Sequence, residues 1–180
     1  MTPAANKEAT ASQNRAVVPP MRLPMTHHEL LETLGGTPDR VKSLAHGLSP
    51  TRLTRRPREG EWSMTEILTH LLLGERDVIF PRLQRMLLEG APTFPSSATG
   101  RTGFAAAPAL RDFGEDLGAF REVRSRTIAF LKSLGQHDWR LIGTTPTRRT
   151  LTIEDYARYL AEHDLEHLSQ LEATRAVIVG

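Results

Sequence analysis

The sequence predicts an all-α protein that folds as a bundle of four main helices. Apolar residues recur every three or four positions in four separate segments, which places them on one face of a helix in each segment. No stretch shows the alternation of a strand over a length that could support a sheet, and no internal repeat is present. The 180 residues, 39% of them hydrophobic and 24% charged, suffice for one domain with a hydrophobic core.

The expected domain covers residues 25–180. Residues 1–24 are rich in Ala, Thr, Ser, Asn and Pro, with too little apolar surface to offset the entropy lost on ordering, so we predict a disordered N-terminal tail. A second irregular stretch, residues 91–107, is rich in Pro, Gly, Ser, Thr and Ala and shows no periodicity. Connections of this length in compact domains are usually functional or mobile.

The first helix is expected to begin at Thr26. Thr26 and Glu29 have the spacing of a capping box, in which each side chain binds a free backbone N–H of the other's turn. We expect Gly35-Gly36 to interrupt this helix. Thr37-Pro38 should then restart it with a cap and a proline at the first helical position.

The second helix is expected from Ser63 to about Glu89. Ser63 and Glu66 form another capping-box pattern, and Gly90 follows the last helical residue. Pro81 lies inside the helix, where it lacks the N–H of an interior residue and should kink or break the chain.

The third and fourth helices follow the irregular stretch. Apolar spacing predicts a helix from about Pro108 to Leu134, ended by Gly135, and another that begins near Thr152. The fourth helix carries five inward-facing residues at helical spacing: Tyr156, Leu160, His163, His167 and Leu171.

Three histidines are the strongest functional signal. His163 and His167 are four residues apart, so on a helix their imidazoles differ by about 40° and leave the same face. His70 lies on the apolar stripe of the second helix and could complete a facial set of nitrogen donors, leaving metal positions open to water or substrate. Buried imidazoles without partners cost roughly 1–3 kcal/mol each, so a shared metal is the economical explanation. The chain has no cysteine, which excludes thiolate ligands and disulfides.

A peptidase is the sharper alternative for the same residues. His163, Glu166 and His167 have the H-x-x-E-H spacing of inverted zinc proteases, in which the Glu activates a water held by zinc. We expect little room after His167 for the downstream ligand of such proteases, and no sheet edge to hold an extended peptide. His70 would also have no role there.

Two pairs of segments resemble the DinB-like family, the DinB/YfiT superfamily of metal-dependent bundle proteins. The first pair is Arg56–Ser63 with Glu66–Leu71, and the second is Leu151–Tyr156 with His163–Leu168. The similarity covers roughly residues 26–177, and both blocks fall in the expected order on the second and fourth helices.

The resemblance implies a four-helix bundle in which His70, His163 and His167 bind a divalent metal such as zinc or nickel, with frequent homodimerisation. It also implies either a hydrolase or a thiol-dependent S-transferase or isomerase acting on a small molecule. Because the chain lacks cysteine, a reactive low-molecular-weight thiol would arrive as a cosubstrate. Many relatives carry an acidic residue three positions after the helix-two histidine, where this chain has Leu73. The alternative is a non-catalytic metal-binding bundle with a structural or association role.

Residues near His70 have two readings each. Glu66 is better explained as the capping-box carboxylate than as a catalytic group. Gly74, one turn after His70, would either leave open space beside the metal or allow close helix packing. Asp77 would either orient a ligand or pair with an arginine.

The remaining polar and aromatic residues are assigned to the surface and the ends of the bundle. We expect Glu162 and Asp164 to face solvent or a dimer partner, and Trp62 and Trp139 to pack at the bundle ends. The formal charge of +2 and the lack of interleaved aromatics argue against a nucleic-acid partner. Two arginine groups are therefore interpreted as solvated faces: Arg52, Arg55, Arg56 and Arg58, and Arg121, Arg124 and Arg126.

The expected location is the cytoplasm. No apolar run approaches the roughly 18 residues that span a bilayer, so we expect no membrane partner. Residues 1–20 lack the continuous apolar region of a secretory signal.

Overall fold

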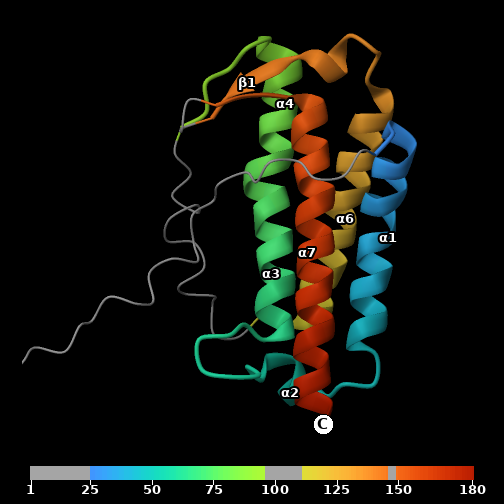
Figure 1. The fold of residues 1–180 in the computed structure, drawn as a ribbon, viewed down its shortest axis with the longest axis vertical. Coiled ribbons are helices and arrows are strands. Elements are labelled where there is room, and N and C mark those ends of the chain that lie inside the picture. Colours follow the sequence, from blue (N-terminus) through green and yellow to red (C-terminus); the bar gives the residue numbers. More distant parts are fainter. Residues whose placement is uncertain (1–24, 96–110, 146–148) are drawn as a thin grey trace, which may run out of the picture.

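The computed structural model describes residues 25–95, 111–145 and 149–180. The predicted tail and most of the 91–107 connection lie outside these described residues. Four long helical rods pack side by side (Figure 1): α1 (His27–Ala45), the continuous run α3 (Met64–Gly74), η1 (Glu75–Ile79) and α4 (Phe80–Glu89), α6 (Phe113–Ser133) and α7 (Ile153–Val179). The predicted all-α four-helix bundle is confirmed.

Smaller elements join the rods at both ends. α2 (Pro50–Thr54) follows α1, and the 3₁₀ turn η2 (Asp138–Arg140) follows α6. β1 (Ile142–Thr144) and β2 (Thr150–Thr152) pair antiparallel beside α4 and the start of α7 (Figure 1). Strands of three residues are too short to leave an alternating pattern in the sequence, which is why this hairpin was not expected.

Helix α1 corrects one prediction, because Gly35-Gly36 does not interrupt it. The helix runs unbroken from His27 to Ala45 with Pro38 in its interior. Thr26 caps it as predicted, with both capping-box bonds present. Glycine weakens a helix by only about 1 kcal/mol, and packing of the buried Leu34 and Val41 against the other rods outweighs that preference.

The second rod contains a widened turn just before Pro81. Ser63 caps it with both capping-box bonds, and Gly90 follows it with a φ of 83°. Pro81 does not break the rod. The π-helical segment η1 directly precedes α4, and Pro81 takes one of the first positions of that helix, where a missing N–H is tolerated.

The core consists of two apolar clusters. One includes Leu30, Leu83 and Trp139 and lies toward the hairpin, and the other includes Leu68 and Phe120 and lies toward α2. Trp139 packs at the bundle end as predicted, stacked on His27 with ring centroids 3.8 Å apart. Among the described residues, no helix is both long and apolar enough to cross a membrane.

Candidate metal centre

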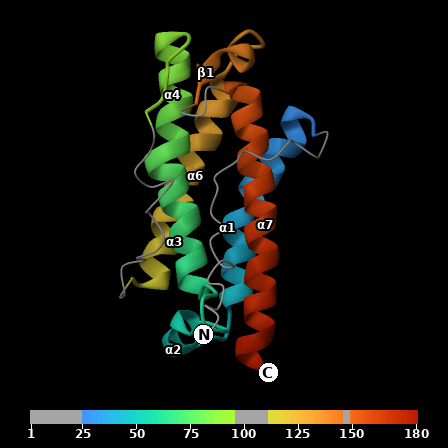
Figure 2. The ribbon, with the colours of Figure 1, turned by 60° about the vertical axis from the view of Figure 1, so that its left-hand side comes forward.

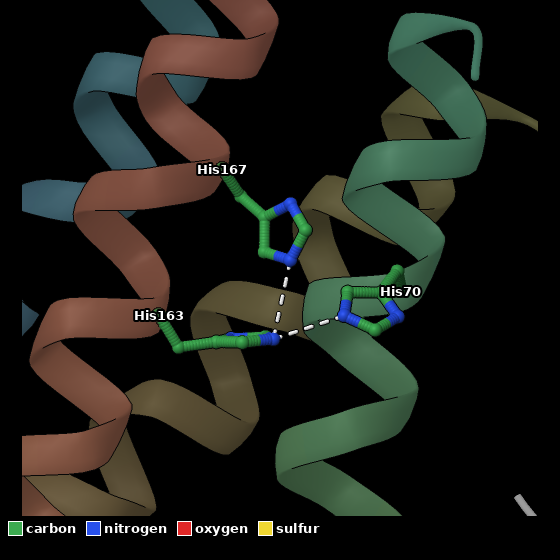
Figure 3. A group of neighbouring side chains, drawn as sticks. All are labelled: His70, His163 and His167. Atoms are coloured by element: carbon green, nitrogen blue, oxygen red, sulfur yellow. Dashed lines mark hydrogen bonds between the residues drawn. The ribbon is translucent and has the colours of Figure 1, made fainter. Parts of the chain in front are cut away.

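Three imidazoles converge in the space between the second and fourth rods. His70 projects from α3, and His163 and His167 project from successive turns of α7, which runs beside α3 in both ribbon views (Figures 1 and 2). All three rings point toward one another (Figure 3). The Nε2 of His163 lies 2.9 Å from Nε2 of His70 and 3.2 Å from Nε2 of His167. One ring nitrogen from each residue lies within 4.8 Å of the others.

Hydrogen bonding alone does not explain this arrangement. The Nε2 atom of a neutral imidazole carries either one proton or one lone pair, so His163 Nε2 can make only one good bond to its two neighbours. Two nitrogens bound about 2.1 Å from one metal, at angles between octahedral and tetrahedral, are roughly 3.0–3.4 Å apart. The observed spacings fall close to that range. The donor set therefore fits a divalent metal held from one side, and its metal binding stays a prediction.

The surroundings keep these imidazoles neutral. Burial, and then repulsion between the protonated forms of His70 and His167, lowers the pKa of His70 from the usual 6.5 to about 3. Burial likewise holds the pKa of His163 well below its usual value, with further contributions from His167, His70 and Arg124. The pKa of His167 is also lowered by burial. Neutral imidazole is the form that binds metals, so all three are ready donors at pH 7.

One histidine has an orienting partner that the sequence reading did not identify. His167 Nδ1 lies 2.8 Å from the side-chain oxygen of Gln170, three residues later on α7. An oxygen acceptor there requires the proton on Nδ1, which leaves the lone pair on Nε2 facing the other two rings. The i, i+3 spacing of His167 and Gln170 was the available signal.

Two aromatic rings form walls of the site. Trp62 is not only an end residue: its ring lies 5.0 Å from that of His70 and stacks 6.1 Å from that of His167. Tyr159 lies one turn before His163, with ring centroids 5.6 Å apart. Burial, and then the nearby charge of Glu166, raises the pKa of Tyr159, so its hydroxyl stays protonated and can donate a hydrogen bond. The i−4 spacing to His163 was the signal for Tyr159.

Structural contacts decide between the readings offered near His70. Glu66 makes the capping-box bonds and also binds Arg56, which is the predicted structural role. Asp77 pairs with Arg76 at 2.7 Å, so the arginine-pair reading holds. A Cβ at Gly74 would meet no atom within 4 Å, which favours open space over close packing.

Two surface predictions were wrong. Arg124 is buried rather than solvated, and Asp164 is buried rather than turned to solvent or a partner. The two form an ion pair inside the bundle. Both residues can be buried because a guanidinium and carboxylates are tolerated in the core when each satisfies the other's hydrogen bonds. The four arginines between 52 and 58 are exposed, as expected.

The fold and the site define a class of protein: a four-helix bundle that gathers three neutral histidines between two of its rods. The sequence model of the DinB superfamily matches residues 33–171, and the chain belongs to that superfamily. The resemblance inferred from the helix-two and helix-four motifs is confirmed.

Two proteins from Bacillus subtilis are similar to this chain. The uncharacterized protein YuaE of strain 168 is 28% identical over 148 residues, spanning 73% of this chain and 88% of YuaE. The solved structure of YfiT is reported as "a probable metal-dependent hydrolase with an unusual four-helix bundle topology". It matches with a TM-score of 0.73 at 18% identity, covering 85% of this chain and 89% of YfiT, so that likeness establishes the fold.

Proposed function

We propose that this protein is a metal-dependent hydrolase of a small molecule, with His70, His163 and His167 as the ligands of one divalent metal. Zinc and nickel are the metals that the family resemblance favours. The observation that carries the proposal is the position of His163 Nε2, 2.9 and 3.2 Å from the Nε2 atoms of the other two histidines. The description of YfiT as a metal-dependent hydrolase on the same fold adds support.

The chain's own residues would perform three tasks. The histidines offer three neutral donors from two helices, an incomplete set that leaves positions for substrate and so favours catalysis over a structural role. Tyr159 places its ring beside that of His163 and carries a hydroxyl that stays protonated. Trp62 shields two of the imidazoles with its ring. A divalent metal, when bound, would supply Lewis acidity and lower the pKa of a coordinated water or thiol.

Two other functions remain to be separated from hydrolysis. A thiol-dependent S-transferase or isomerase would need a small thiol as cosubstrate, since the chain has no cysteine. A non-catalytic bundle would bind metal without turning over any substrate. Catalysis that requires both metal and added thiol favours the first, and metal binding without any catalysis favours the second.

The test uses the full chain loaded with zinc or with nickel. Hydrolysis of a panel of small esters and amides is measured with and without metal, and transfer is measured with a low-molecular-weight thiol added. His163→Ala should abolish metal-dependent turnover. His28→Ala is the matched control, because the His28 side chain is 80% exposed and pairs with Glu32 one turn later on α1. Turnover that survives metal removal, or that His163→Ala leaves intact, would contradict the proposal.

A further inference from the structure

A layer of buried polar residues crosses the bundle beside the histidines. Each rod contributes one: Thr37 from α1, Glu75 from η1, Arg124 from α6 and Asp164 from α7, all at most 2% exposed. In the order of residues along each rod, this layer falls near the point where the core passes from one apolar cluster to the other, and Phe80, which follows Glu75 but packs in the cluster toward α2, is an exception. The four side chains thus divide the hydrophobic core into two parts.

Arg124 is the centre of the layer. Its Nε donates to both carboxylate oxygens of Glu75 at 3.0 and 2.9 Å, and its Nη2 donates to Glu75 Oε2 at 2.8 Å. Nη1 and Nη2 also donate to the two carboxylate oxygens of Asp164, the second at 3.1 Å. Thr37 Oγ1 completes the set by donating to Asp164 Oδ2 at 2.7 Å. One guanidinium therefore holds two buried carboxylates in fixed positions.

The first rod is tied to the same group through a backbone carbonyl. Pro38 has no N–H, so it cannot bind the carbonyl of Leu34 four residues earlier, as an ordinary interior residue would. Arg124 Nη1 donates to that carbonyl at 2.8 Å. A single side chain on α6 thus contacts polar groups on all three other rods.

The two carboxylates come from the segments that carry the histidines. Asp164 directly follows His163, about 100° further round α7, so His163 faces α3 when Asp164 faces Arg124. Glu75 follows His70 by five residues, at the point where the second rod widens into η1. Arg124 therefore binds one carboxylate on each histidine-bearing rod, on the side of the rod that faces the core.

Metal binding requires the two histidine-bearing rods to be positioned within narrow limits. An imidazole nitrogen roughly 6 Å from a helix axis moves about 1 Å when the helix turns by 10°. Metal–ligand distances tolerate about 0.2 Å. Buried ion pairs are often no more stabilising than apolar side chains of the same volume, so net stability is a poor explanation for a charged layer here.

We propose that Arg124 is a positioning residue for the metal centre. By holding Glu75 and Asp164, it fixes the rotation and spacing of the two rods, and so fixes the convergence of His70 with His163. This inference rests on the proposed metal site, and it adds a role for residues that contact neither metal nor substrate.

The experiment compares Arg124→Lys with Arg121→Lys. Both arginines lie on α6, but Arg121 is 41% exposed and pairs with Asp39 on the surface. Lysine keeps the charge and loses the planar fork that bridges two carboxylates. Thr37→Val is the second variant, because it loosens Asp164 without changing any charge. Each full-length protein is titrated with Co²⁺ while its visible absorption spectrum is recorded, and unfolding of the metal-free forms is followed separately.

The expected result is a loss of Co²⁺ affinity of at least tenfold and shifted absorption bands for Arg124→Lys, with at least a threefold loss for Thr37→Val. Arg121→Lys should match the wild type in both readouts. If Arg124→Lys does not fold, Thr37→Val decides. Folded variants that keep the wild-type spectrum and an affinity within twofold would overturn the positioning role while leaving the metal site intact. A wild type that binds no Co²⁺ would overturn both proposals.

Discussion

The three histidines lie on two rods, whereas the Arg124 layer draws one residue from each of the four rods, and the two groups differ in almost every physical property. The histidines are partly exposed, neutral, and too close together for ordinary hydrogen bonding to satisfy them all. The layer is buried and charged, and its guanidinium binds a partner through each of its nitrogens. Under the proposals above, the buried and ion-paired layer holds the histidine cluster in position.

The largest expected difference is in stability. Arg124→Met leaves Glu75 and Asp164 buried without their cation, so the free energy of unfolding should fall by about 3–5 kcal/mol. His163→Ala removes a half-buried neutral ring and should cost about 1 kcal/mol in the metal-free protein. Chemical denaturation of the two metal-free variants checks this. Equal losses would remove the distinction between the clusters.

Acid should destabilise the metal-free protein through the histidines. The folded-state pKa of His70 is about 3, and those of His163 and His167 are also below 6.5. Below pH 6.5 the unfolded chain therefore binds more protons than the folded one. For each extra proton, the free energy of unfolding falls by up to about 1.4 kcal/mol per pH unit. The stability contributed by the neutral rings is fully present above pH 6.5 and is lost as the pH falls toward 3.

Denaturation at a series of pH values measures this slope. His163→Gln should flatten it relative to the wild type, because glutamine does not titrate. Identical slopes for the two proteins would show that the imidazoles are not held neutral by burial.

A smaller loss of stability is expected from a change at Thr69, the residue before His70. Thr69 precedes His70 and donates its hydroxyl to the buried Asp116 at 2.6 Å. Thr69→Val should lower the free energy of unfolding by about 1 kcal/mol, because Asp116 keeps its hydrogen bonds from Nε and Nη2 of Arg111. Calorimetric unfolding and a Co²⁺ titration check the variant. A loss of Co²⁺ affinity as large as that of Arg124→Lys would contradict the claim that the Arg124 layer in particular positions the histidines.

The smallest effect is a gain. Gly74 has helical backbone angles, φ −59° and ψ −44°, and open space beyond its Cα. Gly74→Ala should therefore stabilise the protein by about 0.5–1 kcal/mol and leave Co²⁺ affinity unchanged. Thermal unfolding measures the gain, and a loss of stability would contradict the open space assigned to this position. A loss of turnover at unchanged affinity would assign that space to the substrate.

The sequence predicted the bundle because its signals are local. Capping pairs such as Ser63 with Glu66, helical apolar spacing, and a terminal Gly90 all act within one or two turns. The same locality explains one error. Gly35-Gly36 was expected to interrupt the first helix on propensity, and packing of a continuous helix against the other rods overrides that preference.

The polar layer could not be predicted for the opposite reason. Arg124 pairs with Glu75 and Asp164 across 49 and 40 positions of sequence, and its neighbours Arg121 and Arg126 are ordinary surface arginines. All three are arginines on one helix, so the sequence offers no reason to expect Arg124 to be buried when Arg121 and Arg126 are not. The histidines were recognisable because two share one helix face, His70 lies on the apolar stripe of another helix, and the family resemblance supports all three as ligands.

Metal content is the most direct test of the central claim. Wild-type protein and His163→Ala are stripped of metal, equilibrated with excess zinc or nickel, dialysed, and analysed for bound metal per chain. We predict one metal ion per wild-type chain and none retained by the variant. Wild-type protein without stoichiometric metal, or a variant that keeps it, would contradict a centre built from His70, His163 and His167.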